Sequence, residues 1–103
     1  MKRFTRTPRI RLDLDKAADY YEQESATLSL RFLTAFGHAV RLARTHPAVG
    51  SLRHGKSDES AELRYVITNG FPYLLFYKDE TESIVLLRLL HMSRNIPAAL
   101  RRR

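Results

Sequence analysis

The sequence contains no cysteine and little glycine, and both shortages exclude specific kinds of chemistry. Without cysteine the chain forms no disulfide, offers no thiolate to a metal and has no thiol nucleophile, which is typical of the reducing cytoplasm. Gly50, Gly55 and Gly70 stand apart from one another, so no glycine-rich loop that cradles a phosphate is predicted. No apolar run approaches the roughly 18 residues of a membrane-spanning helix. We therefore expect a cytoplasmic protein that does not bind a membrane.

Motifs for metal binding and covalent catalysis are lacking as well. No two histidines are spaced as a metal-binding pair on a helix, and the chain has no HExxH motif. Ser57 and Ser60 have no general base near them in the sequence. We therefore expect no metal, no cofactor and no nucleophilic catalysis. The four histidines are His38, His46, His54 and His91.

Positive charge is abundant and gathers at the two ends of the chain. Eighteen Lys and Arg against eleven Asp and Glu give a net charge of +7, which favours an acidic partner or a polyanion. Acidic residues follow the basic start from Asp13 onward in place of an apolar stretch, so we expect no secretory signal. No motif that reads a DNA groove is present, so we expect DNA contact mainly through partner proteins. The last ten residues carry only basic charges, at Arg94, Arg101, Arg102 and Arg103.

Length and hydrophobic periodicity predict one α+β domain over residues 1–103, with the order β-α-α-β-β-β. Residues 4–12 alternate loosely and read as an edge strand, after which Asp13 is expected to cap a short helix. Residues 26–45 form a second amphipathic helix, which starts after Ser25. The short break between the helices predicts an antiparallel hairpin. The apolar stripe of the first helix consists of Leu14, Ala17, Ala18 and Tyr21.

The second half of the chain has the period of a mostly antiparallel sheet, across which the hairpin packs. Strands are predicted over residues 63–68, 73–77 and 83–92, and the last is apolar enough to be covered on both faces. Residues 50–61 read as a polar loop, and Asn69-Gly70 is a turn signal. The basic tail, about residues 98–103, either adds a short helix or stays loose.

Arg88 is unusual because it interrupts the apolar run of the last strand. Such an arginine needs an anionic partner, for example in a cross-strand salt bridge, or else faces a functional surface. His91, near the end of the same strand, is either a structural histidine or a functional one. Basic and aromatic groups on these strands are suited to phosphate binding, to general acid–base catalysis at a ribose 2′-hydroxyl, or to docking of an acidic peptide. Strand alternation places Ile84, Leu86, Arg88, Leu90 and Met92 on one face.

Two segments of this half closely resemble the ParE toxins of bacterial toxin–antitoxin pairs. Residues 71–77 (FPYLLFY) and 88–97 (RLLHMSRNIP) are similar to the family's FPYxxFY and RxLHxxRDIP patterns. The His46-Pro47 pair followed by Gly50 resembles the family's P-x-x-G, and the likeness extends from about Leu12 to Leu100. The resemblance implies the RelE/ParE fold and a plasmid-stabilising cytoplasmic toxin. It also implies neutralisation by a ParD-type antitoxin in a hetero-oligomer, and inhibition of DNA gyrase.

The resemblance leads us to expect two binding surfaces and no covalent chemistry by the chain itself. The alternative for the antitoxin-binding side chains is an ordinary core position. The expected target-facing residues are Arg88, His91, Arg94, Arg101, Arg102 and Arg103. The expected antitoxin-binding residues are Tyr20, Tyr21, Phe32, Phe36 and Val40.

The sequence is compatible with two other functions. A RelE-like, ribosome-dependent mRNA endoribonuclease is one, although Tyr73 stands where those nucleases have an arginine and residues 96–100 include no tyrosine. Lys56 is the only lysine in the loop before the strands. An inactive protein that binds its antitoxin and represses its own operon is the other. Asn95 replaces the family's aspartate, which bears on potency more than on fold. The candidate nuclease residues are Arg64, Tyr73, His91 and Arg94.

Overall fold

The computed structural model describes residues 1–52 and 63–101, and the first helix starts earlier than the sequence predicts. Strand β1 (Arg3–Arg6) is an edge strand of only four residues, and helix α1 (Pro8–Glu22) follows almost at once. Pro8 stands in the first helical turn, where its fixed φ favours the helix and its missing N–H costs nothing. The predicted strand over residues 4–12 is therefore wrong beyond Arg6. Asp13 lies inside the helix and is not its cap.

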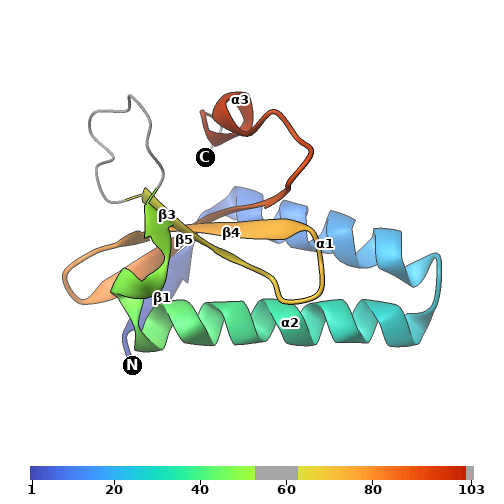
Figure 1. Cartoon of the computed structure of the whole chain (residues 1–103), viewed down its shortest axis with the longest axis horizontal. Coiled ribbons are helices and arrows are strands. Elements are labelled where there is room, and N and C mark those ends of the chain that lie inside the picture. Colours follow the sequence, from blue (N-terminus) through green and yellow to red (C-terminus); the bar gives the residue numbers. More distant parts are fainter. Residues whose placement is uncertain (53–62, 102–103) are drawn as a thin grey trace.

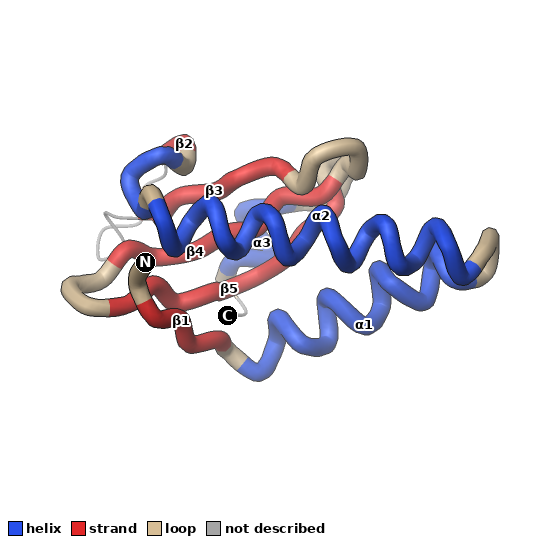
Figure 2. Tube along the Cα trace, turned by 90° about the horizontal axis from the view of Figure 1, so that it is seen from below, coloured by secondary structure: helices blue, strands red, loops and turns tan. Residues whose placement is uncertain are grey.

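Helix α2 (Ala26–Thr45) has the predicted bounds. The Ser25 side chain caps its start, because its Oγ accepts a hydrogen bond of 3.0 Å from the Leu28 N–H. Ser29 ties the helix to α1 by donating from its Oγ to the Ala18 carbonyl. The two helices thus form the predicted hairpin, and Figure 2 shows α2 lying over the strands and meeting α1 at the hairpin turn.

Among the residues that the structure describes, the sheet contains five strands in the order β1-β5-β4-β3-β2, and only the β1–β5 pair is parallel. The predicted fold class, a helical hairpin on a mostly antiparallel sheet, is confirmed. Helix α2 leads through a short 3₁₀ turn, η1 (Pro47–Val49), into the strand region. The remaining strands are β2 (Ser51–Leu52), β3 (Leu63–Ile67), β4 (Tyr73–Asp79) and β5 (Ser83–His91).

A register shift between Phe76 and Tyr77 changes which face the later residues of β5 occupy. Phe76 pairs with Arg88 while Tyr77 pairs with Leu86, so Leu87 is the extra residue of a bulge. As a result Leu89, not Leu90, joins Ile84 and Leu86 in the core under the hairpin, whereas Leu90 lies in the core on the other face. The predicted alternation is therefore wrong after Leu87, because an inserted residue reverses the period of two.

Both faces of β5 are covered, as predicted for a central strand. The hairpin covers one face, and helix α3 (Ile96–Leu100) packs Ala99 and Leu100 against the other. Figure 1 shows α2 and α3 on opposite sides of the strands. The described part of the tail is thus a short helix ending at Leu100. No helix in the described part of the chain is long and apolar enough to cross a membrane.

Candidate functional site

Arg88 is buried and bound to a carboxylate on the first helix. Its side chain is 2% exposed, and its Nε and Nη2 donate to Asp13 at 2.7 and 2.9 Å. Its Nη1 donates to the Ala99 carbonyl of α3 at 2.7 Å. The same Asp13 carboxylate accepts the Leu89 N–H at 3.0 Å, beyond the point where β1 stops pairing with β5. One ion pair therefore joins α1, β5 and α3.

This burial corrects the expectation that Arg88 faces a target. The anionic partner that an arginine in an apolar strand requires is present, but it comes from helix α1 and not from a neighbouring strand. Asp13 was expected only to cap a helix, so its pairing role was missed. Sequence offers a weak signal for such a pair: a lone arginine in a buried strand and a carboxylate on the inward side of an amphipathic helix.

His91 and Tyr73 form a cross-strand pair at the end of β5. Their ring centroids lie 5.1 Å apart in an edge-to-face arrangement. The His91 Nδ1 accepts the Ser93 N–H at 3.0 Å and lies 2.9 Å from the Ser93 Oγ, so this nitrogen is already engaged. Burial raises the pKa of the Tyr73 hydroxyl, and Tyr21 and Tyr20 add to the increase. The structure thus brings together two of the four candidate nuclease residues.

The exposed candidates Arg94 and Arg101 flank helix α3. Arg94 is exposed in the turn after β5, where its N–H donates to the His91 carbonyl. Asn95 caps α3 by accepting the Ala98 N–H at 3.3 Å through its side-chain oxygen, a bond that an aspartate would also make. Arg101 is exposed at the other end of α3. The candidates Arg102 and Arg103 lie outside the described residues, as do His54, Gly55, Lys56, Ser57 and Ser60.

Arg64 lies far along the sheet from His91 and has a different task. It pairs with Tyr77 in the β3–β4 register, whereas Tyr73 opposite His91 is four residues away on β4. At a strand rise of about 3.3 Å per residue, that is on the order of 13 Å. The Arg64 Nη1 donates to the carbonyls of Ala48 and Gly50, at 3.1 and 2.9 Å. The four candidate nuclease residues are therefore not assembled at one place.

Tyr77 explains the His46-Pro47 and Gly50 pattern at the exit of α2. The Tyr77 hydroxyl donates to the Pro47 carbonyl at 2.6 Å and accepts the Gly50 N–H at 3.2 Å. A Cβ at Gly50 would lie 2.5 Å from that hydroxyl, so the close approach requires glycine. Burial raises the pKa of Tyr77, while the Gly50 N–H and Arg64 oppose the shift. These motif residues thus hold the segment between α2 and the sheet.

The five expected antitoxin-binding residues separate into core and surface. Phe32 is 0% exposed and Val40 is 9% exposed, so the free surface expected at these two positions is wrong: they are core residues under the hairpin. The physical reason is that the sheet already covers the wide apolar stripe of α2. Tyr21 and Phe36 are half-buried at the edge of this core, and Tyr20 is exposed. Tyr21 and Phe32 also pack against Phe71 and Tyr73 in an aromatic cluster.

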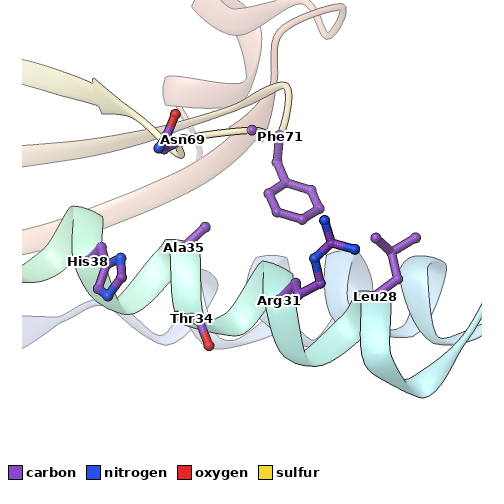
Figure 3. Close-up of a pocket in the computed structure, with 8 residues that line it drawn as sticks. Leu28, Arg31, Thr34, Ala35, His38, Asn69 and Phe71 are labelled. Atoms are coloured by element: carbon purple, nitrogen blue, oxygen red, sulfur yellow. The ribbon is translucent and has the colours of Figure 1, made fainter.

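A surface pocket that the sequence did not predict lies between α2 and the β3–β4 turn. It has a volume of about 400 Å³, and Figure 3 shows His38, Ala35, Arg31 and Leu28 following one another along α2 beside it. Hydrophobic periodicity places Arg31 and His38 on the polar side of the helix and gives no sign of a pocket there. The turn that forms the opposite wall becomes a neighbour only through the tertiary fold. The lining residues are Leu28, Arg31, Thr34, Ala35, His38, Asn69, Gly70 and Phe71.

Within residues 1–52 and 63–101, no group of three or more His, Cys, Asp or Glu side chains is arranged to hold a metal ion. The described surface offers exposed arginines and a pocket, both of which are suited to binding a partner.

Comparison with known proteins identifies the family. The structure resembles a chain of the chromosomal ParDE toxin–antitoxin system from P. aeruginosa, with a TM-score of 0.72 and 17% identity over 90% of this chain and 98% of that one. A conserved hypothetical protein from Helicobacter pylori matches with a TM-score of 0.54 and 17% identity, over 91% and 98% of the two chains. At such identities the likeness shows the fold alone.

The family of the protein is shown by its sequence, whereas the structural neighbours show only its fold. A search of curated proteins finds no match. Residues 5–96, by contrast, match the family described as the ParE toxin of the type II toxin–antitoxin system ParDE. Because this match spans most of the chain, the protein belongs to the ParE toxin family of type II toxin–antitoxin systems.

Proposed function

We propose that this ParE-family toxin inhibits DNA gyrase by binding to it in the cytoplasm, and that a ParD-type antitoxin neutralises it. The toxin performs no covalent chemistry of its own in this proposal. Its target-facing surface consists of His91, Arg94 and Arg101, extended by the basic tail to Arg103. Arg88 supports this surface from within, because it fixes α3 through the Ala99 carbonyl.

The proposal rests on the difference between the arginines that are bound within the protein and those that are exposed beside α3. Arg88 and Arg64 are committed to Asp13 and to backbone carbonyls, whereas Arg94 and Arg101 are exposed at the two ends of α3. A five-residue helix spans about 8 Å, so only a short stretch of backbone separates the two arginines. Two exposed arginines over a short, capped helix suit recognition of an acidic protein surface.

The ribonuclease alternative requires several catalytic side chains to meet at one site, and the observed positions of the candidates disfavour this. Acid–base cleavage of a phosphodiester needs several groups within hydrogen-bond reach of one reacting site. Arg64 lies at the other end of β3, and the His91 Nδ1 is engaged by Ser93. Tyr73 and His91 remain as one pair, with Arg94 in the turn after His91, and this set lacks Arg64. We therefore favour binding over catalysis.

The test measures both activities of the purified chain side by side. In one arm, gyrase from the native host supercoils plasmid DNA in the presence of the toxin, and trapped cleaved DNA is quantified. In the other arm, ribosomes that carry a defined mRNA are incubated with the toxin, and cleavage is mapped. We expect loss of supercoiling and cleaved DNA that disappears when the antitoxin is added, with intact mRNA. Cut mRNA with unaffected gyrase would contradict the proposal.

A further inference from the structure

The pocket beside α2 is closed on its other side by the β3–β4 turn, which is held in place by hydrogen bonds and ring packing. Thr68 holds the turn by donating from its Oγ1 to the carbonyls of Phe71 and Tyr73, each at 3.1 Å. The Phe71 ring is fixed in turn, because it packs edge-on against Tyr21 and Phe32 with centroids 5.0 and 5.2 Å away. Gly70 completes the turn with φ of 87°, in the left-handed region. A preformed wall lowers the entropy lost when a ligand segment binds.

The wall formed by α2 carries the positive charge of Arg31 and the imidazole of His38, with the small side chain of Ala35 between them. Arg31 and His38 are seven residues apart, about two helical turns or 10 Å, and Ala35 leaves space between them. None of the lining residues is acidic. In the described part of the chain Arg31 has no ion pair and no hydrogen bond through its guanidinium, so its charge is available to a partner. Figure 3 shows this guanidinium directed toward the Phe71 side of the pocket.

The apolar surface continues beyond the pocket along the same side of the helix. Leu42 lies one turn after His38 and is 42% exposed. Ile67, at the end of β3 and next to the turn, is 56% exposed. A surface of this length fits a segment of chain better than a single small ion, since exposed apolar side chains gain free energy when a partner covers them.

We propose that this pocket docks an acidic, partly apolar segment of the antitoxin. An apolar side chain of that segment fills the space over Ala35 against Phe71, and carboxylates on either side of it reach Arg31 and His38. This inference rests on the proposed function, because it takes the ParD-type antitoxin as the partner. The charge of the pocket favours an acidic occupant, and the chain as a whole carries +7.

The position of the pocket distinguishes the antitoxin from the target. The pocket lies on the hairpin side of the sheet, whereas α3, which Arg94 and Arg101 flank, packs on the opposite face. A partner docked in the pocket therefore leaves the proposed gyrase-binding surface to another part of the antitoxin. In this proposal the pocket contributes to the affinity for the antitoxin and is not part of the gyrase-binding surface.

The test is isothermal titration of the purified toxin with the purified ParD-type antitoxin encoded beside it. The variant Arg31→Glu reverses a charge in the pocket. The matched control Arg41→Glu makes the same change of charge on an exposed residue of the same helix that does not line the pocket. We expect Arg31→Glu to weaken binding at least tenfold and Arg41→Glu to change it less than twofold. His38→Ala should weaken binding severalfold, and both pocket variants should inhibit gyrase as the wild type does.

Four results would overturn the inference. If Arg31→Glu and Arg41→Glu reduced the affinity for the antitoxin equally, the effect would come from long-range electrostatic attraction alone. If Arg31→Glu left the affinity unchanged, the pocket would be empty in the complex. A pocket variant that binds the antitoxin normally but no longer inhibits gyrase would assign the pocket to the target. An antitoxin that does not bind the wild-type toxin would remove the partner itself, and with it that part of the proposed function.

Discussion

For single residues, the buried ion pair with Asp13 explains why the ParE-like motif of this chain begins with Arg88. Arg88 reaches Asp13, which lies 75 residues earlier in the chain, and one carboxylate serves both the guanidinium and the free Leu89 N–H of β5. A polar group at the sheet edge that would otherwise be unsatisfied thus gains a partner. The ParE-like sequence pattern therefore mixes residues that hold the fold with residues that face the solvent.

Removal of Asp13 tests this role. Asp13→Ala leaves a buried guanidinium without its counter-ion, so we expect the free energy of unfolding to fall by about 3–5 kcal/mol. Urea denaturation measures it. The control Asp15→Ala removes the exposed partner of Arg11 and should cost less than about 1 kcal/mol. Similar losses in the two variants would show that the Arg88 pair does not hold the fold.

The buried hydroxyl of Tyr77 predicts a sensitivity to alkali. Because burial raises its pKa in the folded chain above the ordinary value of about 10, the unfolded chain loses this proton first as the pH rises. The contribution of Tyr77 is therefore complete below about pH 10 and is lost above it. Tyr77→Phe should cost about 1–3 kcal/mol at pH 7, because the Pro47 carbonyl and the Gly50 N–H lose their partner.

The same substitution should make the loss of stability above pH 10 less steep. Urea unfolding at a series of pH values measures both effects. Tyr65→Phe is the matched control, since the Tyr65 ring packs on Phe76 and its hydroxyl has no hydrogen-bond partner within the described residues. Identical pH profiles for the Tyr77 variant and the wild type would contradict the argument.

At the scale of elements, the junction between α2 and the sheet is held by close packing as well as by hydrogen bonds. Gly50→Ala should destabilise the protein by roughly 1–3 kcal/mol, because its methyl group would lie 2.5 Å from the Tyr77 hydroxyl and 3.0 Å from the Tyr65 carbonyl oxygen. Gly37→Ala, in the middle of α2 with no atom within 4 Å of the new Cβ, should stabilise it by about 0.5–1 kcal/mol. Thermal unfolding distinguishes the two, and effects of equal sign would refute the packing argument.

The elements that the sequence predicts well are those with a long, uninterrupted period. Helix α2 has the predicted bounds because Ser25 provides a cap and the apolar stripe continues for five turns. The boundary between β1 and α1 is missed because the signal of Pro8 is ambiguous: it suits an edge strand and a first helical turn alike. The bulge at Leu87 is missed because nothing in the sequence of β5 marks an inserted residue.

The candidate site was predictable only in part, for a related reason. The pairing of Tyr73 with His91 follows from two neighbouring antiparallel strands. The partners of Arg88 and Arg64 come from helix α1 and from the η1 region, which are distant in sequence, and periodicity carries no information about them. Phe32 and Val40 read as a free apolar face until the area that the sheet covers is known.

At the scale of the whole molecule, the sheet separates two surfaces of different character. The hairpin side offers a pocket with Arg31 and His38, and the other side offers α3 with Arg94 and Arg101 beside it. Lys2 adds to the rigidity of the frame, because its ammonium binds Asp79 and thereby ties the N-terminus to the β4–β5 hairpin. In our proposals, the antitoxin and the target bind to different sides of this core.

We propose that this protein acts by binding gyrase through the arginines beside α3. The most direct test is the dissociation constant of the purified toxin with purified gyrase, measured for the wild type, for the double variant Arg94→Ala/Arg101→Ala and for the control Arg41→Ala. We expect the double variant to bind at least about tenfold more weakly, the equivalent of 1.4 kcal/mol, and the control to bind as the wild type does. Equal affinities for all three proteins, or no binding by the wild type, would contradict the account.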